Sequence, residues 1–261
     1  MSPQPVVPSE VIDRLRAAGC VFAEDEARLL VAAAGTPAEL GRLLVHRTSG
    51  LPLEHVLGWV DFAGLRITVR PGVFVPRRRT GLLVKRAARL LRPNTVVVDL
   101  CCGSGAVGAA LLTEEPTLTL YAVDVDPVAA ACAHDNIAAL GGTALTGDLF
   151  SPLPLALLGQ VDLVVANAPY VPTDAIARMP PEARLHETHV ALDGGADGLD
   201  VQRRLVAAAP EWLMSGGHLL VETSARQAPE TAAIFARHGF TARVVHSRKL
   251  DGTVVIGIRS A

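Results

Sequence analysis

The sequence has few aromatic residues, few cysteines and no long uninterrupted apolar run. Two Trp, two Tyr and six Phe occur among 261 residues, although half of the residues are hydrophobic. A membrane-spanning helix needs roughly 20 consecutive apolar residues, and the first residues lack the basic and then apolar pattern of a signal peptide. We therefore expect a cytoplasmic protein without a membrane partner, whose apolar residues form a core.

The cysteines indicate neither a disulfide framework nor a metal site. They are Cys20, Cys101, Cys102 and Cys132. No C-x-x-C pair occurs among them, so we interpret them as reduced residues that pack in the interior. His186, Glu187 and His189 also lack the i, i+4 histidine pair of helical zinc sites. The sequence therefore predicts no bound metal.

The net charge is small, but the basic residues are unevenly distributed. The formal charge of −2 argues against a nucleic-acid surface over the whole molecule. Seven basic residues nevertheless lie between Arg77 and Arg92. This stretch is either a solvated helix face or a patch for an anionic partner, and direct nucleic-acid binding is expected only through it. Nothing in the sequence specifies an oligomer, and we expect a monomer.

Local signals divide the chain into three parts. Helical periodicity, with a capping box from Thr36 to Glu39 and Pro37 at the first helical position, predicts a helical domain over residues 1–51. Extended segments around Ala63 and Gly64 predict a β-hairpin linker over residues 52–76. Residues 77–261 then form the predicted catalytic domain.

Short apolar runs alternate with helical patterns through this third part. The expected strands are Thr95–Leu100, Thr119–Val123, a strand near Leu145, Val161–Ala166 and His218–Glu222. Such alternation is typical of an α/β fold with a parallel sheet and helices on both faces. Thr241–His246 and Thr253–Arg259 are joined by a short polar turn, which predicts a closing antiparallel pair.

The first of these strands leads into a glycine-rich loop. The loop residues are Cys101, Cys102, Gly103, Ser104 and Gly105. Glycines let the backbone approach a ligand, and the helix expected from Ala106 offers unpaired N–H groups. Asp99, at the end of the strand, is placed to hold the loop backbone or the ammonium group of a bound amino acid. Because Gly103, Gly105 and Gly108 also match G-x-G-x-x-G, the loop alone is compatible with NAD as well as with S-adenosylmethionine.

Two later strand ends add candidate cofactor-binding residues. Asp124 ends the second strand, where it can accept ribose hydroxyls of either cofactor. Asp148 and Leu149 follow the third strand, where the carboxylate can accept from an adenine amino group and the leucine can cover the ring. The plain structural interpretation is a polar loop and a core leucine.

The fourth strand ends in the most informative segment, Asn167, Ala168, Pro169 and Tyr170. Methylation of an amide nitrogen requires the group to be oriented while its nitrogen loses planarity. The Asn167 side-chain oxygen and the Ala168 carbonyl can both accept from one NH₂ group, since Pro169 restricts the residue before it. Tyr170 can pack against the planar group and a sulfonium. Asn167 is therefore a candidate for both substrate and cofactor contact.

Together, these segments resemble the class I methyltransferases that modify planar nitrogens, whose clamp is usually Asn-Pro-Pro-Tyr. The segments GLPLEHVLG, FVPRRRTGLLV and ALDGGADGLD extend the resemblance to the release-factor glutamine methyltransferase family over nearly the whole chain. The resemblance implies a seven-stranded Rossmann-like catalytic domain, an N-terminal helical domain that docks a protein substrate, and methyl transfer from S-adenosylmethionine to a glutamine side-chain nitrogen. It also implies that Glu187 supports the substrate loop.

Two departures from the family pattern indicate a paralogue with a different protein target. Ala168 replaces the first proline of the clamp, and the segment Arg78 to Gly81 lacks a proline and two acidic residues that the family has around Thr80. Three alternatives stay open at this point. They are a nucleic-acid adenine methyltransferase, because the clamp suits any planar NH₂ group, an NAD-dependent oxidoreductase, and a cofactor-binding scaffold that has lost turnover.

Overall fold

The computed structural model describes residues 7–260. The first six residues, which belong to the predicted helical domain and to the start judged to lack a signal peptide, lie outside the described residues. No helix within the described residues is long and apolar enough to cross a membrane.

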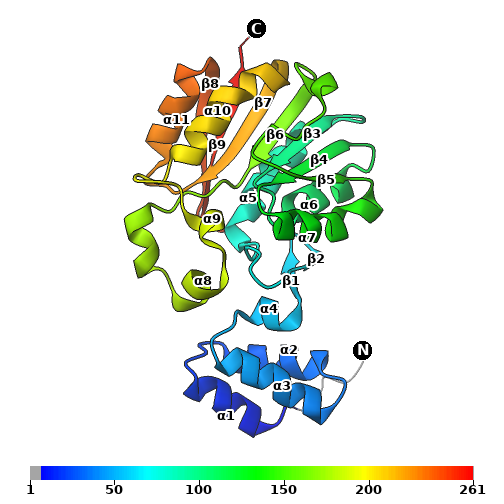
Figure 1. Cartoon of the computed structure of the whole chain (residues 1–261), viewed down its shortest axis with the longest axis vertical. Helices are drawn as coiled ribbons and strands as arrows, with labels where there is room; N and C mark the ends of the chain where they lie inside the picture. The colour runs from blue at the N-terminus through cyan, green and yellow to red at the C-terminus, as the bar shows by residue number, and fades with distance from the viewer. Residues whose placement is uncertain (1–6, 261) are drawn as a thin grey trace.

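Three helices form a small N-terminal bundle (Figure 1). They are α1 (Ser9–Ala17), α2 (Ala23–Ala33) and α3 (Pro37–Thr48). Their apolar faces enclose a separate core around Leu15 and Leu30, both with no exposed surface. The side chain of Thr36 accepts from the Glu39 N–H, as in a capping box, but the Glu39 carboxylate accepts from Gly35 rather than from Thr36 itself. The cap therefore includes one more residue than the sequence motif predicts.

A one-turn helix and a short hairpin follow the bundle. They are α4 (Leu53–Leu57), β1 (Trp59–Phe62) and β2 (Leu65–Thr68). Ala63 and Gly64 both have positive φ, at 51° and 85°, as a two-residue hairpin turn requires. The paired hairpin is thus shorter than the extended segment expected from the sequence, because α4 occupies its beginning.

The central element is a seven-stranded sheet in the order β5-β4-β3-β6-β7-β9-β8. Its strands are β3 (Val96–Leu100), β4 (Thr119–Asp124), β5 (Thr143–Thr146), β6 (Val161–Ala166), β7 (Leu213–Thr223), β8 (Phe240–Ser247) and β9 (Gly252–Arg259). The pairs from β5 to β7 are parallel, and β9 lies antiparallel between β7 and β8. The predicted α/β fold with a closing antiparallel pair is confirmed.

Helices cover both faces of this sheet (Figure 1). One face packs against α5 (Gly81–Ala87), α6 (Ala106–Glu114) and α7 (Pro127–Ile137), and the other against α10 (Asp200–Trp212) and α11 (Ala228–Arg237). The strand alternation explains the two cores, since Val97 joins the first and Val98 the second, both fully buried. A buried parallel sheet leaves its polar groups at the strand ends, where the loops gather.

The chain between β6 and α10 leaves the sheet and extends toward the N-terminal bundle (Figure 1). It carries α8 (Pro181–His186) and α9 (His189–Leu192). Arg47 of α3 donates to Glu182 of α8 at 2.7 Å. This segment therefore contacts both the bundle and the edge of the sheet where the candidate site lies.

Candidate active site

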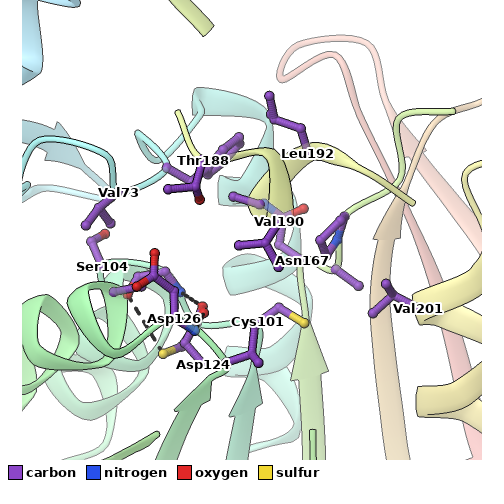
Figure 2. Close-up of a pocket in the computed structure, with 18 of the residues that line it drawn as sticks. Val73, Cys101, Ser104, Asp124, Asp126, Asn167, Thr188, Val190, Leu192 and Val201 are labelled. Carbon is purple, nitrogen blue, oxygen red and sulfur yellow. Dashed lines mark hydrogen bonds between the residues drawn. The ribbon is translucent and has the colours of Figure 1, made fainter. Parts of the chain in front are cut away.

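A cavity of about 480 Å³ opens at the carboxyl ends of the parallel strands. Its walls come from the loops after β3, β4, β5 and β6, from the chain following the hairpin, and from the segment around α9. In Figure 2, Thr188, Val190 and Leu192 lie across the cavity from Cys101 and Asp124. The size and position are those of a ligand site in an open α/β sheet.

The predicted cofactor-binding and clamp residues line this cavity, with the exception of Gly105. Gly105 has a φ of 73°, and a Cβ on it would lie 2.9 Å from the Cβ of Ala133 in α7. Glycine is required there because α6 and α7 approach closely. Gly103, with a φ of 55°, has open space where its Cβ would be. The loop thus contains one glycine that permits packing and one beside the cavity.

Asp99 holds the start of α6. Its side chain is 1% exposed and accepts from the Gly108 N–H at 2.9 Å. Burial raises the pKa of Asp99 to about 7, against the opposing effect of that hydrogen bond. The carboxyl group lies behind the glycine loop, yet it still forms part of the cavity wall.

The carboxylate of Asp124 organises the neighbouring strand end. Asp124 accepts from the Gly103 N–H at 2.8 Å and from the Asp126 N–H at 3.0 Å. Burial raises its pKa. Asp126, which also faces the cavity, caps α7 by accepting from the Val128 N–H at 2.8 Å. The Asp124 carboxylate therefore joins the glycine loop to the turn before α7, where Asp126 lies (Figure 2).

The next strand end supplies Asp148 and Leu149. Asp148 forms an ion pair with Arg204 of α10, and Leu149 has a positive φ of 49°. Such a conformation is unusual for a leucine and occurs where the surroundings impose it. Both residues line the cavity.

The polar groups at this end of the cavity fit an adenosyl cofactor. Ser104 is 2% exposed, and its hydroxyl has no hydrogen-bond partner within the described residues. A buried hydroxyl without a partner is costly unless a ligand or water satisfies it. Asp124 and Asp126 add acceptors suited to ribose hydroxyls. No group of three or more His, Cys, Asp or Glu suited to a metal occurs among residues 7–260.

The clamp segment directly follows β6 and lines the cavity together with the glycine loop. Its residues are Asn167, Ala168, Pro169 and Tyr170. Asn167 lines the cavity, and Figure 2 shows no hydrogen bond from it to the other residues drawn. Ala168 is 1% exposed. Burial and the nearby Glu222 carboxylate raise the pKa of Tyr170 to about 12. Tyr170 is therefore a neutral phenol near pH 7.

The adjacent cysteines are not activated nucleophiles. Burial raises the pKa of Cys101 and of Cys102 well above the usual thiol value, and neighbouring aspartates act in the same direction. Thiols, rather than thiolates, are therefore present near neutral pH.

Glu187 joins the hairpin linker to the segment above the cavity. Its carboxylate accepts from the Val75 N–H at 3.1 Å and from Arg77 at 2.6 Å, and its side chain has no exposed surface. A parallel bridge also pairs Gly72 with Glu187. These contacts fix the chain that leads into Thr188 and Val190.

Two residues beside the clamp were not among the sequence candidates. Glu222, at the end of β7, is 1% exposed, and neither of its oxygens has a hydrogen-bond partner within the described residues. Gln227, before α11, donates to the carbonyls of Tyr170 at 2.9 Å and Asp197 at 3.0 Å. Glu222 could have been predicted as a site residue in the same way as Asp99, because each is an acidic residue near the end of an apolar strand. Gln227 gave no comparable signal, because its role depends on contacts distant in sequence.

Comparisons with known proteins find methyltransferases. Residues 64–195 match the model of the "Methyltransferase small domain". The chain is 39% identical to the release factor glutamine methyltransferase of Geobacter sulfurreducens over 200 residues, 76% of this chain and 69% of that protein. It is 35% identical to the protein of the same name from Cereibacter sphaeroides over 260 residues, 92% of each chain. Among solved structures, a methyltransferase from Pyrococcus furiosus shares the fold at 14% identity, covering 85% of this chain and 98% of that chain with a TM-score of 0.57.

Proposed function

Because the chain belongs to the release factor glutamine methyltransferase family, we propose that it methylates the side-chain amide nitrogen of a glutamine in a protein. The methyl donor is S-adenosylmethionine, and a peptide chain release factor is the first substrate to test. The observation that carries this proposal is the cavity, in which an adenosyl-binding loop and the Asn167 to Tyr170 segment face the same space. The oxidoreductase alternative leaves that segment without a task.

The cofactor end of the cavity is assigned to the glycine loop and three strand ends. Ser104, Asp124 and Asp148 hold the polar groups of the adenosyl part, and Leu149 covers its ring. When bound, S-adenosylmethionine supplies an electrophilic methyl group. Asp99 keeps the loop and α6 in place through its hydrogen bond to the Gly108 N–H.

The clamp orients the substrate amide. The Asn167 side-chain oxygen and the Ala168 carbonyl accept from the two N–H bonds of the glutamine NH₂ group, and Tyr170 packs against its plane. Hydrogen bonds that strengthen as the nitrogen becomes tetrahedral stabilise the transition state more than the ground state. Because the nitrogen loses its proton after attack, no strong base is needed, consistent with the neutral phenol of Tyr170.

The replaced proline and the Arg78 to Gly81 segment support a paralogue with its own protein target. Ala168 keeps the backbone carbonyl that the clamp needs. Arg79 adds a positive charge to the cavity wall, and the substrate that suits this wall can therefore differ from that of its relatives.

Methyl transfer to a defined glutamine tests the proposal. The protein is incubated with labelled S-adenosylmethionine and, in separate reactions, with a release factor and with extract proteins, and modified sites are mapped by mass spectrometry. We expect label on a glutamine side chain in at least one protein. Label on adenine of added nucleic acid, with none on protein, would instead favour the nucleic-acid alternative.

A further inference from the structure

Two arginines enter the cavity wall directly after the hairpin linker, at the end that holds the clamp. Arg77 and Arg79 both line the cavity, together with Tyr170. Arg78, between them, is directed elsewhere, since its guanidinium reaches the Lys249 carbonyl at 3.5 Å and does not line the cavity. Residues 77–79, at the start of the 3₁₀ turn Arg78–Thr80, therefore alternate between facing the cavity and facing away from it.

The two cavity arginines differ in how closely a carboxylate pairs with each guanidinium. Arg77 donates to the buried Glu187 carboxylate at 2.6 Å, and its guanidinium lies 5.1 Å from the centre of the Phe74 ring. Its position is fixed on two sides. Arg79 approaches Glu222 only through Nε, at 3.6 Å, which is too long for a hydrogen bond. Its guanidinium also lies beside the Tyr170 phenol, where it opposes the rise of that group's pKa. Among the described residues its terminal nitrogens form no ion pair with a carboxylate, so a carboxylate of a ligand can approach them.

The exposure of the Arg79 side chain also indicates that a ligand can reach it. The Arg79 side chain is 44% exposed, while that of Glu222 is 2% exposed. The carboxyl group thus holds Arg79 from the protein side, and the guanidinium keeps a face toward the cavity and solvent. Burial also raises the pKa of Glu222 to about 7, so near neutral pH this carboxyl neutralises Arg79 only in part.

The cavity is electrically polarised as a result. Its acidic side chains lie at the ends of β3, β4 and β5 or directly after them, at the cofactor end: Asp99, Asp124, Asp126 and Asp148. Arg79 lies beside Tyr170 at the clamp end. An anionic group on an incoming substrate is repelled from the first region and attracted to the second. A guanidinium with free paired N–H groups is suited to a carboxylate.

We infer that Arg79 is a specificity determinant that favours protein substrates with an aspartate or glutamate beside the methylated glutamine. The inference rests on the proposed function and identifies the class of substrate within it. A nucleic-acid phosphate could also bind a guanidinium, but three other residues of the cavity wall, Val171, Met179 and Val190, are apolar. They suit a peptide chain better than a sugar-phosphate chain.

The test uses peptides with one central glutamine and neighbouring residues that are acidic, neutral or basic. For the wild-type protein we expect kcat/KM about 10-fold higher with acidic than with neutral neighbours, about 1.4 kcal/mol. Binding of the same peptides is measured by fluorescence anisotropy in the presence of S-adenosylhomocysteine, so that preference is read without turnover. Single-stranded DNA is added as a competitor.

Three variants distinguish a charge effect from a folding effect. In Arg79→Gln the preference for acidic neighbours should fall below 2-fold, and Arg79→Lys should restore most of it. Arg78→Gln, the matched control outside the cavity, should keep the wild-type preference.

The outcomes separate the two proposals. Glutamine methylation with equal kcat/KM for all three peptide sets would overturn the role of Arg79 while leaving the proposed function intact. An acidic preference in binding without any methylation would support Arg79 and refute the function. If single-stranded DNA displaces the bound peptides at a lower concentration than unlabelled acidic peptide does, Arg79 binds nucleic-acid phosphate. That result would overturn the inference.

Discussion

At the scale of single residues, Asn167 is the side chain on which the proposed chemistry depends most. It lines the cavity, without a hydrogen bond to the other cavity residues drawn in Figure 2. We expect Asn167→Ala to lower kcat by an amount equivalent to roughly 2 to 4 kcal/mol, because a positioned transition-state acceptor is lost. Steady-state kinetics with the protein that the wild type methylates measure this loss of kcat. Asn167→Asp, which retains a side-chain oxygen, should keep more activity, and an unchanged kcat in Asn167→Ala would contradict the clamp.

The raised pKa of Glu222 predicts how the free energy of unfolding changes with pH. Its pKa is raised from 4.5 to about 7 by burial, so between these values the folded state binds more protons than the unfolded state. The free energy of unfolding therefore falls as pH rises through this window, by at most about 1.4 kcal/mol per pH unit from this group. Asp99 contributes with the same sign, since its pKa is also about 7.

Thermal unfolding between pH 5 and pH 8 tests this sign with Glu222→Gln beside the wild type. The variant lacks the titrating group, so its melting temperature should fall less steeply across the range. The remaining slope is expected from Asp99. Parallel curves for the two proteins would show that Glu222 does not titrate in this window.

At the scale of elements, the clamp is supported by a loop and a helix start that the sequence places far apart. Val171 pairs with Asp193 in a parallel bridge, and the Gly194 N–H donates to the Val171 carbonyl at 2.9 Å. Gly198 has a φ of 80°, and a Cβ on it would lie 2.4 Å from the Tyr170 carbonyl. The glycines of the ALDGGADGLD segment thus allow this loop to pack directly behind Tyr170.

Gln227 locks the same arrangement through its bonds to the Tyr170 and Asp197 carbonyls. Gln227→Ala leaves two carbonyls without their donor, and we expect a stability loss of about 1 to 3 kcal/mol. We also expect kcat to fall while the affinity for S-adenosylhomocysteine changes little. Calorimetry and kinetics measure both. Gln160→Ala, at an exposed position, is the control, and equal kcat in the two variants would argue against a positioning role.

Local pattern was sufficient for most elements but not for their arrangement. The strands were predictable because buried parallel strands are continuous apolar runs, as from Val161 to Ala166. The one-turn helix Leu53–Leu57 was not, since five residues carry too little periodicity. The placement of β9 between β7 and β8 depends on long-range pairing. The contacts of Glu222 with Arg79 and of Gln227 with Tyr170 also join residues far apart in the sequence. Residues at strand ends were therefore foreseeable, whereas their supports were not.

At the scale of the whole molecule, one segment links three regions. The chain carrying α8 and α9 contacts the N-terminal bundle through Glu182, the hairpin linker through Glu187, and the cavity through Thr188 and Val190. The position of the cavity wall is thus tied to the position of the bundle. Two ion pairs, Arg47 with Glu182 and Arg77 with Glu187, carry this connection.

Arg47 has one ion-pair partner inside the N-terminal bundle, Glu26, and one in α8, Glu182. Separate substitutions can therefore test the two contacts. Arg47 is 8% exposed at its side chain and bonds Glu26, which is 11% exposed, at 2.6 Å, whereas Glu182 is 49% exposed. Removing a buried partner leaves an uncompensated charge, so Arg47→Leu should destabilise the bundle by about 3 to 5 kcal/mol. Glu182→Gln keeps the buried pair and should cost less than about 1 kcal/mol. Hydrogen exchange should then show fast exchange in α2 and α3 for Arg47→Leu, but in Glu182→Gln only around α8 and α9. Equal protection of α8 in Glu182→Gln and wild type would mean that the bundle and the cavity wall are held together by other contacts.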